Sequence, residues 1–493
     1  MLFNSYSFIF VYLPITLLVF FSIAKFKSIK FALGWLTFAS FLFYSYWNPT
    51  YLVLLLISIS FNYKIGKIIN QAELKSQWAK MSMGLGIILN LCIIGYYKYA
   101  NFLISTFNPE LSQNLDLENI FLPLGISFYT FTQIAYLVDA YRGETKDSDY
   151  DLITYSLFVC FFPQLIAGPI LRHDELIPQF KQQQTFHLSD ENLARGLVLF
   201  GLGLAKKVLI ADNLSPWVAP VFEHASDVTF IEAWVGALSY TFQLYFDFSG
   251  YSAMAIGLGW MFNINLPINF NSPYKAISIT DFWRRWHITL SNFLRDYLYI
   301  PLGGSRKGNM RRYINLLLTM LLGGLWHGAG WTYVAWGGLH GFYLCINHRW
   351  RQSGIPLPKL LGWGITFFVV ICGWVLFRAS TFTDAREIIQ TMLGFNGIVI
   401  PGEAEGKLAV LTQFGFELRS WRSLAYLPQF AQRKAMTFVV LMGLILGAVC
   451  LPNTQQMMEK FKPNSIWVIF MGLMTGICLI CLNRVSEFIY FQF

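Results

Sequence analysis

Charge-poor apolar runs divide the chain almost from end to end. A helix needs about 20 mainly apolar residues to cross the ~30 Å hydrocarbon layer of a bilayer. Two of the runs are long enough for a broken pair of helices. The runs cover 7–24, 31–46, 51–63, 83–105, 120–138, 153–170, 194–212, 229–262, 313–347, 358–377, 436–451 and 465–482. The pattern predicts an all-α polytopic membrane protein with about 11 to 13 spanning helices plus interfacial or re-entrant helices.

Composition agrees with this prediction and excludes a soluble protein. Hydrophobic residues make up 55% of the chain and charged residues 13%, about half the ~25% that is usual in a soluble domain. We expect residues 1–493 to form a single membrane-embedded domain surrounded by membrane lipid, without a nucleic-acid partner. The first run has no basic residue before Lys25, so we expect it to remain as an anchor and not to be removed as a signal peptide.

Basic residues concentrate between Lys275 and Arg312, where eight of them accompany two acidic residues. The surplus of six is most of the net charge of +9, and the positive-inside rule assigns this block to the cytoplasmic side. Two interpretations stay open: the block sets topology alone, or some of its cations bind the phosphates of a cytoplasmic cofactor. The candidates for phosphate contacts are Arg284, Arg285, Arg306 and Lys307.

Two non-spanning helices are predicted from periodicity. After Thr280, which can cap a helix, apolar residues recur every three or four positions up to Tyr297, which indicates one amphipathic helix lying at the membrane interface. Thr381 and Asp384 can cap a second helix that ends near Gly394. We interpret 379–435 as this interfacial helix followed by a loop.

Three histidines fall in or beside apolar sequence, where a polar side chain is costly and needs a partner or a purpose. His327 lies among glycines in a Gly-Gly-Leu-Trp-His-Gly segment, His340 follows thirteen residues later, and His287 lies in the basic block. Imidazole can accept and return a proton near neutral pH, as acyl transfer to a hydroxyl requires. The alternative is that each histidine is hydrogen-bonded packing between helices, and for His340 we favour that alternative.

Other titratable residues have structural explanations. Asp139 ends one apolar run and Asp247 lies inside another, and for both we favour ion pairing over a catalytic role. His173 lies in a polar stretch, where we expect it to be solvated. No cluster of ligating residues predicts a metal site.

Several segments in and around the apolar runs form a specific set of motifs. They are Leu122–Phe128, Asp139–Gly143, Phe162–Ile170, Tyr245–Ser252, Asp281–His287, Phe293–Gly304, Leu325–Gly328 and Trp374–Ala379. Together they resemble the membrane-bound O-acyltransferase superfamily, and within it the bacterial alginate O-acetyltransferase type of membrane subunit. The resemblance extends from about residue 120 to 395.

The resemblance implies a helical fold around a central tunnel with a histidine at its narrow centre. The family's signature histidine falls on His327, and its second active-site position falls on His287. The implied location is a bacterial cytoplasmic (inner) membrane. His340 is similar to a further histidine of this branch, and its role stays open.

The hypothesis that follows is an O-acetyltransferase with no permanently bound cofactor. Acetyl-CoA would be the cytoplasmic donor, and an exported polysaccharide or cell-wall glycan would be modified. The direct acceptor stays open between this glycan and a hydroxyl of an extracytoplasmic acetyltransferase partner, which the resemblance implies. His327 would be the general base and His287 would position or polarise the donor carbonyl. The alternatives are a transporter or flippase with histidines along its path, a non-catalytic scaffold, and an enzyme that transfers D-alanine or a longer acyl chain.

Overall fold

The computed structural model describes residues 1–26, 28–108, 121–146, 150–402, 409–430, 433–482 and 489. The start of the run expected from 120, and parts of the loop expected over 379–435, lie outside these ranges. Within them the fold is helical except for two short strands, β1 (Ile398–Pro401) and β2 (Phe416–Arg419), which pair in parallel with Ile398 opposite Phe416. The helical fold class is confirmed for the described chain.

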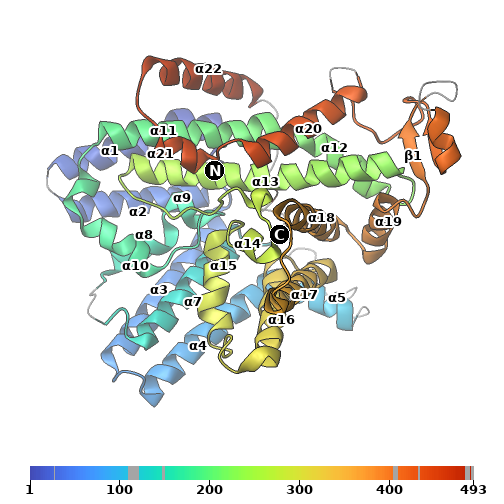
Figure 1. The fold of residues 1–493 in the computed structure, drawn as a ribbon. Coiled ribbons are helices and arrows are strands. Elements are labelled where there is room, and N and C mark those ends of the chain that lie inside the picture. The colour runs from blue at the N-terminus through green and yellow to red at the C-terminus, as the bar shows by residue number, and fades with distance from the viewer. Residues whose placement is uncertain are drawn as a thin grey trace.

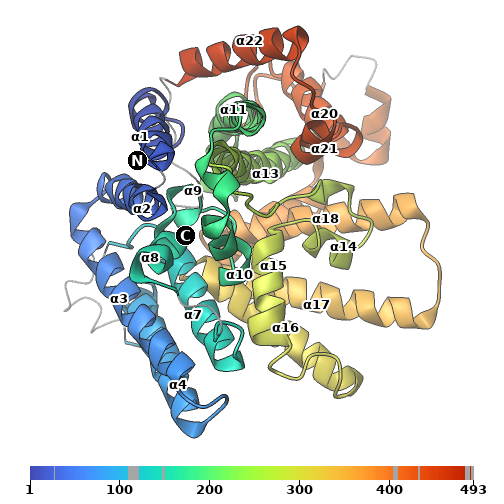
Figure 2. The ribbon, with the colours of Figure 1, turned by 90° about the vertical axis from the view of Figure 1, so that its left-hand side faces the viewer.

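The N-terminal part is a set of helices, most of which pack together on one side of the molecule (Figures 1 and 2), while α5 (Ala100–Phe107) lies at the right in Figure 1. It comprises α1 (Leu13–Lys25), α2 (Ile29–Ser45), α3 (Pro49–Gln71), α4 (Gln77–Ile94), α5 (Ala100–Phe107), α7 (Ile126–Arg142), α8 (Leu152–Cys160), α9 (Phe162–Leu165) and α10 (His173–Leu176). A π-helical turn, η2 (Gly95–Tyr99), joins α4 to α5. The run expected over 153–170 is therefore not one helix, because α8 ends at Cys160 and only the short α9 follows.

Among the described residues, four helical segments are long and apolar enough to cross a membrane by themselves. They are Phe8–Lys25, Pro49–Gln71, Gln77–Phe107 and Lys359–Arg378. The molecule is thus built to enter a bilayer, and the count of 11 to 13 spans stays a prediction.

A long central helix crosses the molecule, with α11 (Asp190–Ala205) and α12 (Asp212–Glu223) beside it (Figure 1). This helix, α13 (Phe230–Met261), is continuous over 32 residues, although the run 229–262 is long enough for a broken pair. Its glycines serve close packing: a Cβ on Gly250 would lie 2.8 Å from the carbonyl oxygen of Gly203 in α11. Small residues let two backbones approach without interrupting either helix.

The basic block does not form the single amphipathic helix that periodicity predicts. Ser278, not Thr280, caps a short α14 (Ile279–Trp283), and a new helix, α15 (Ile288–Leu294), begins only after His287. The aromatic residues of this segment face protein and not lipid, because the buried Trp286 packs on Trp374 with ring centroids 4.8 Å apart. The break coincides with the left-handed conformation of His287 described below.

The C-terminal half positions the candidate site. The run 313–347, which is long enough for a broken pair, contains two helices, α16 (Gly308–His327) and α17 (Trp331–Ser353), and α18 (Lys359–Arg378) lies against α17 (Figure 2). The predicted helix after Arg378 is confirmed as α19 (Phe382–Met392), which starts with a capping box between Thr381 and Asp384. The remaining helices are α20 (Ala435–Cys450), α21 (Thr454–Glu459) and α22 (Ser465–Cys481).

Candidate active site

His327 is the last residue of α16, and its ring lies in an aromatic enclosure. The ring centroids of Trp326, Trp336 and Phe377 lie 5.0, 5.1 and 5.5 Å from that of His327. The residue is 3% exposed. Three helices therefore shield this imidazole from bulk water, which favours its neutral, proton-accepting form.

Close approach of α16 and α17 creates this enclosure. Gly324 and Gly337 face each other, and a Cβ on Gly324 would overlap the carbonyl oxygen of Tyr333. Without side chains at these two positions the helices pack backbone to backbone, so Trp336 of α17 reaches the ring of His327. The glycine-rich sequence around His327 thus serves helix packing directly.

Two adjacent residues of the π-helical turn η2 hold the end of α16. The Nζ atom of Lys98 donates to the carbonyl oxygen of Trp326 at 2.5 Å and lies 3.4 Å from that of His327. The hydroxyl of Tyr99 donates to the carbonyl oxygen of Leu325 at 2.8 Å. The last carbonyl groups of a helix have no partner within that helix, so Lys98 and Tyr99 satisfy them and fix the position of His327.

Sequence reasoning missed Lys98, although a signal was present. Lys98 is the one charged residue of the run 83–105, and an ionisable side chain at membrane depth is a functional-site hypothesis by default. The π-helical turn that carries it is a further mark, since such turns are frequent at functional sites. That turn was not visible in the sequence.

His287 is held in a strained conformation between α14 and α15. Its φ is 42°, in the left-handed region that side-chain-bearing residues rarely adopt, and the residue is fully buried. Its Nδ1 lies 3.1 Å from Oδ1 of Asn269, which also accepts from the backbone N–H and the hydroxyl of Thr289. Strain of this kind persists only where surrounding contacts enforce it, and Asn269 supplies those contacts.

The Asn269 contact also assigns the tautomer of His287. A backbone N–H can only donate, so the Asn269 atom that it meets at 3.2 Å is the amide oxygen. His287 Nδ1 must then carry the hydrogen that it shares with this oxygen. In the neutral ring Nε2 is left as the hydrogen-bond acceptor.

His340 lies one helical layer away, on α17. Its Nδ1 accepts a hydrogen bond from the indole N–H of Trp283 at 3.3 Å. Trp336 lies between His340 and His327, and the ring centroids of Trp336 and His340 are 4.8 Å apart. On the other side, Trp326 lies between His327 and His287, 6.1 Å from the His287 ring. The fold therefore gathers the three histidines around two tryptophans.

The four basic residues predicted for phosphate binding fall in two places. Arg284 and Arg285 line a pocket of about 640 Å³ together with Arg351. Arg306 and Lys307 lie in the turn before α16 and are not among the residues that line this pocket. An apolar pocket of about 310 Å³ adjoins the basic one, since both are lined by Ile277, Ser278, Asn347, Trp350 and Leu357.

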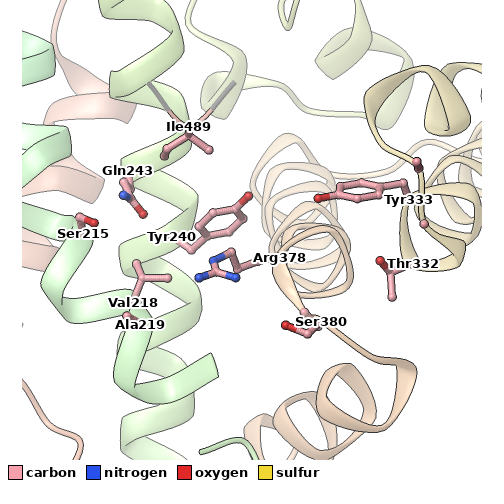
Figure 3. Close-up of a pocket in the computed structure, with 13 residues that line it drawn as sticks. Ser215, Val218, Ala219, Tyr240, Gln243, Thr332, Tyr333, Arg378, Ser380 and Ile489 are labelled. Carbon is pink, nitrogen blue, oxygen red and sulfur yellow. The ribbon is translucent and has the colours of Figure 1, made fainter. Parts of the chain in front are cut away.

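A second polar pocket lies at the opposite end of α18 (Figure 3). Its volume is about 460 Å³, and Arg378 at the end of α18 lines it together with residues of α12, α13 and α17. The polar lining side chains are Ser215, Tyr240, Gln243, Thr332, Tyr333, Arg378 and Ser380. We call this pocket the Arg378 pocket, and we call the basic pocket lined by Arg284, Arg285 and Arg351 the Arg284 pocket.

The two acids predicted as ion-pair partners are confirmed in that role. Asp247 lies 2.7 Å from Nζ of Lys207, which also contacts Asp212 at 2.8 Å. Asp139 pairs with Arg142 at 3.4 Å and with Arg172 at 3.5 Å, and accepts from the hydroxyl of Tyr297 at 2.7 Å.

The expectation of a solvated His173 is wrong, because it is 2% exposed beneath the Asp139 network. Desolvation by burial lowers the pKa of His173 and raises the pKa of Asp139 to about 6. Asp139, Glu144 and His173 are close enough to suggest a cation site. However, Nη2 of Arg172 lies 2.7 Å from Glu144 and also pairs with Asp139, so the guanidinium already supplies the positive charge there.

Comparison with known proteins agrees with the sequence motifs. Residues 41–382 match the model of the membrane-bound O-acyltransferase family. A peptidoglycan O-acetyltransferase of Helicobacter pylori is 40% identical over 100% of this chain and 98% of its own length. A probable alginate O-acetylase of Azotobacter vinelandii is 45% identical over 80% of this chain and 78% of its own.

A more distant similarity extends to another acyl group. A teichoic acid D-alanyltransferase of Streptococcus thermophilus is 28% identical over 52% of this chain and 68% of its own length. The predicted resemblance and the enzyme class are thereby confirmed: this chain belongs to the membrane-bound O-acyltransferase family and is a membrane-integral acyltransferase.

Proposed function

We propose that the protein transfers an acetyl group from acetyl-CoA, bound on the cytoplasmic side, to a hydroxyl at the outer face of a bacterial inner membrane. The product would be an O-acetylated exported polysaccharide or cell-wall glycan. The names of the peptidoglycan and alginate relatives support this acceptor class. The direct acceptor in this proposal is a hydroxyl of an extracytoplasmic acetyltransferase partner or of the glycan itself.

The observation that supports it best is the placement of the histidines between two pockets. The Arg284 and Arg378 pockets lie at opposite ends of α18, whose 20 residues extend about 30 Å, the thickness of the hydrocarbon layer. From the apolar pocket, Tyr343 contacts His340 with a ring distance of 5.8 Å. From the other side, Tyr333 contacts Phe377, which contacts His327.

On the donor side, Arg284, Arg285 and Arg351 would bind the phosphates of acetyl-CoA, and Arg306 and Lys307 would add positive charge to the same face. The apolar pocket next to them has the volume and lining to accept the thin pantetheine chain. The acetyl thioester would then lie toward the histidines.

In the reaction, His327 removes the proton from the acceptor hydroxyl as its oxygen attacks the acetyl carbonyl carbon. The carbon–sulfur bond then breaks, and the imidazolium returns the proton to the leaving thiolate. His287 would position the donor: with its hydrogen on Nδ1 and shared with Asn269, its Nε2 can accept a hydrogen bond but cannot donate one to the carbonyl oxygen. The contact with Asn269 thus favours positioning over polarisation.

The test is acetyl transfer by the purified protein in lipid nanodiscs, followed with radiolabelled acetyl-CoA. His327→Ala should lower the rate of transfer by about 10²–10⁴-fold while the protein keeps its thermal unfolding temperature. Full transfer by a folded His327→Ala variant would contradict the assignment.

The D-alanyltransferase relative makes D-alanyl transfer the second candidate. Mass analysis of the envelope glycan from cells with and without the gene separates the two, because the acetyl and D-alanyl esters differ in mass.

A further inference from the structure

Arg378 is the last residue of α18 and lies in the Arg378 pocket. Among the described residues that line the pocket, Arg378 is the one cation and no side chain is acidic. No carboxylate in the described parts of the chain forms an ion pair with it. Its guanidinium stacks over the ring of Phe222, with Cζ 5.6 Å from the ring centroid, and it is close enough to Tyr240 and Tyr333 to interact with both electrostatically.

A guanidinium in this position favours an anionic ligand. It is half-buried in a concave site, where its charge is screened less than at an open surface. Its planar fork matches carboxylate or phosphate oxygens with two parallel hydrogen bonds. Stacking on Phe222 orients the guanidinium, and Figure 3 shows the Arg378 side chain pointing into the pocket toward Tyr240.

The rest of the lining suits a sugar. The half-buried Tyr333 offers an aromatic ring, and Ser215, Gln243 and Thr332 offer hydroxyl and amide groups that can donate and accept. Convergent polar groups around a pocket of about 460 Å³ are typical of a small-molecule subsite. This volume lies within the range of about 300–1,000 Å³ that is typical of small-molecule pockets.

The pocket lies next to the reactive histidine. Ala329 and Gly330 line it and follow His327 by two and three residues. Tyr333 lies between the pocket and Phe377, and the ring centroids of Tyr333 and Phe377 are 4.9 Å apart. Phe377 in turn contacts the imidazole of His327. A ligand anchored on Arg378 therefore has its other groups close to the wall that encloses His327.

We propose that the Arg378 pocket binds the acceptor through an anionic group, a carboxylate or a phosphate ester on a saccharide, and so selects negatively charged glycan units. This inference rests on the proposed function for the identity of the ligand as acceptor. The binding itself is independent of catalysis. Arg378 is accordingly a specificity-determining residue, distinct from the histidines that carry out the transfer.

The experiment measures binding by calorimetry to the full chain in nanodiscs. The probes are a disaccharide with one carboxylate, its neutral methyl ester, and the same disaccharide with a phosphate ester. Wild type should bind one or both anionic probes about 10- to 100-fold more tightly than the ester, the range for hydrogen bonds to a charged group. The tighter of the two identifies the anionic group.

Arg378→Met should abolish this preference, and Arg378→Lys should retain part of it, because lysine keeps the charge without the fork. Arg386→Met is the matched control: it removes an exposed arginine of α19 that does not line the pocket, and the preference should persist.

Equal binding of charged and neutral probes by wild type would overturn the proposal, and so would a preference that survives Arg378→Met. Because the wild-type comparison needs no variant, misfolding of Arg378→Met leaves the test intact. Failure of acetyl transfer with intact anion preference would instead contradict the proposed function alone.

Discussion

Replacing Lys98 with methionine tests whether the end of α16 determines the activity of His327. Methionine retains most of the length of lysine and removes the ammonium. The carbonyl group of Trp326 then loses its donor at 2.5 Å, and that of His327 loses its neighbour at 3.4 Å. A buried acceptor left without a partner costs about 1–3 kcal/mol.

A shift of the last turn of α16 could bring these carbonyl groups to other donors, and this shift would displace His327. A misplacement of about 1 Å at a catalytic group can lower the rate by about 100-fold. We therefore expect Lys98→Met to lose about 1–3 kcal/mol of stability and to lower kcat much more than it changes the KM for the donor.

The assay combines initial rates of acetyl transfer at saturating donor with thermal unfolding in nanodiscs. Lys98→Arg should retain more activity than Lys98→Met, because its guanidinium can still donate to the helix end. Lys206→Met is a matched control, since Lys206 contacts Thr454 and not α16. A kcat for Lys98→Met within twofold of wild type would refute the argument that this ammonium positions His327.

Three further predictions follow from the site. His327→Ala should lower kcat by about 10²–10⁴-fold, the usual contribution of a general base, with unfolding temperature as the check on folding. Asn269→Ala should lower activity by about 10- to 100-fold, as for other residues that orient an active-site histidine, and nitrogen-15 NMR of labelled histidine should show the loss of the His287 Nδ1–H tautomer. Because the pKa of Asp139 is raised to about 6, the folded state binds the proton of this carboxyl more tightly than the unfolded state does. The free energy of unfolding should therefore fall by up to about 3 kcal/mol as pH rises from about 4 to 6. Urea titrations of Asp139→Asn should show a smaller dependence of this free energy on pH.

The helical fold was predictable because long apolar runs admit few other structures. The break between α16 and α17 was predictable as well, since the run 313–347 exceeds one span and contains a cluster of glycines. The continuity of α13 was not, because its glycines are equally consistent with a break and with close packing on α11. Periodicity alone does not distinguish these two uses of glycine.

At the site, the residue types were predictable and their surroundings were not. His287 and His327 stand out as histidines beside apolar sequence, and the fold gathers both at Trp326. Lys98 acts on residues 228 positions away, and Asn269 acts by imposing a left-handed backbone at His287. Contacts over such separations depend on the tertiary fold, which local sequence patterns do not predict.

The single helix α18 has a consequence for how the chain tolerates change. It touches the apolar pocket near Gly362, His340 near Gly373 and His327 at Phe377, and ends at Arg378. Each added or removed residue would rotate everything beyond it by about 100° and shift it by about 1.5 Å. Length variation in this segment should therefore uncouple the two faces of the enzyme, whereas the helix's lipid-facing side chains are free to vary.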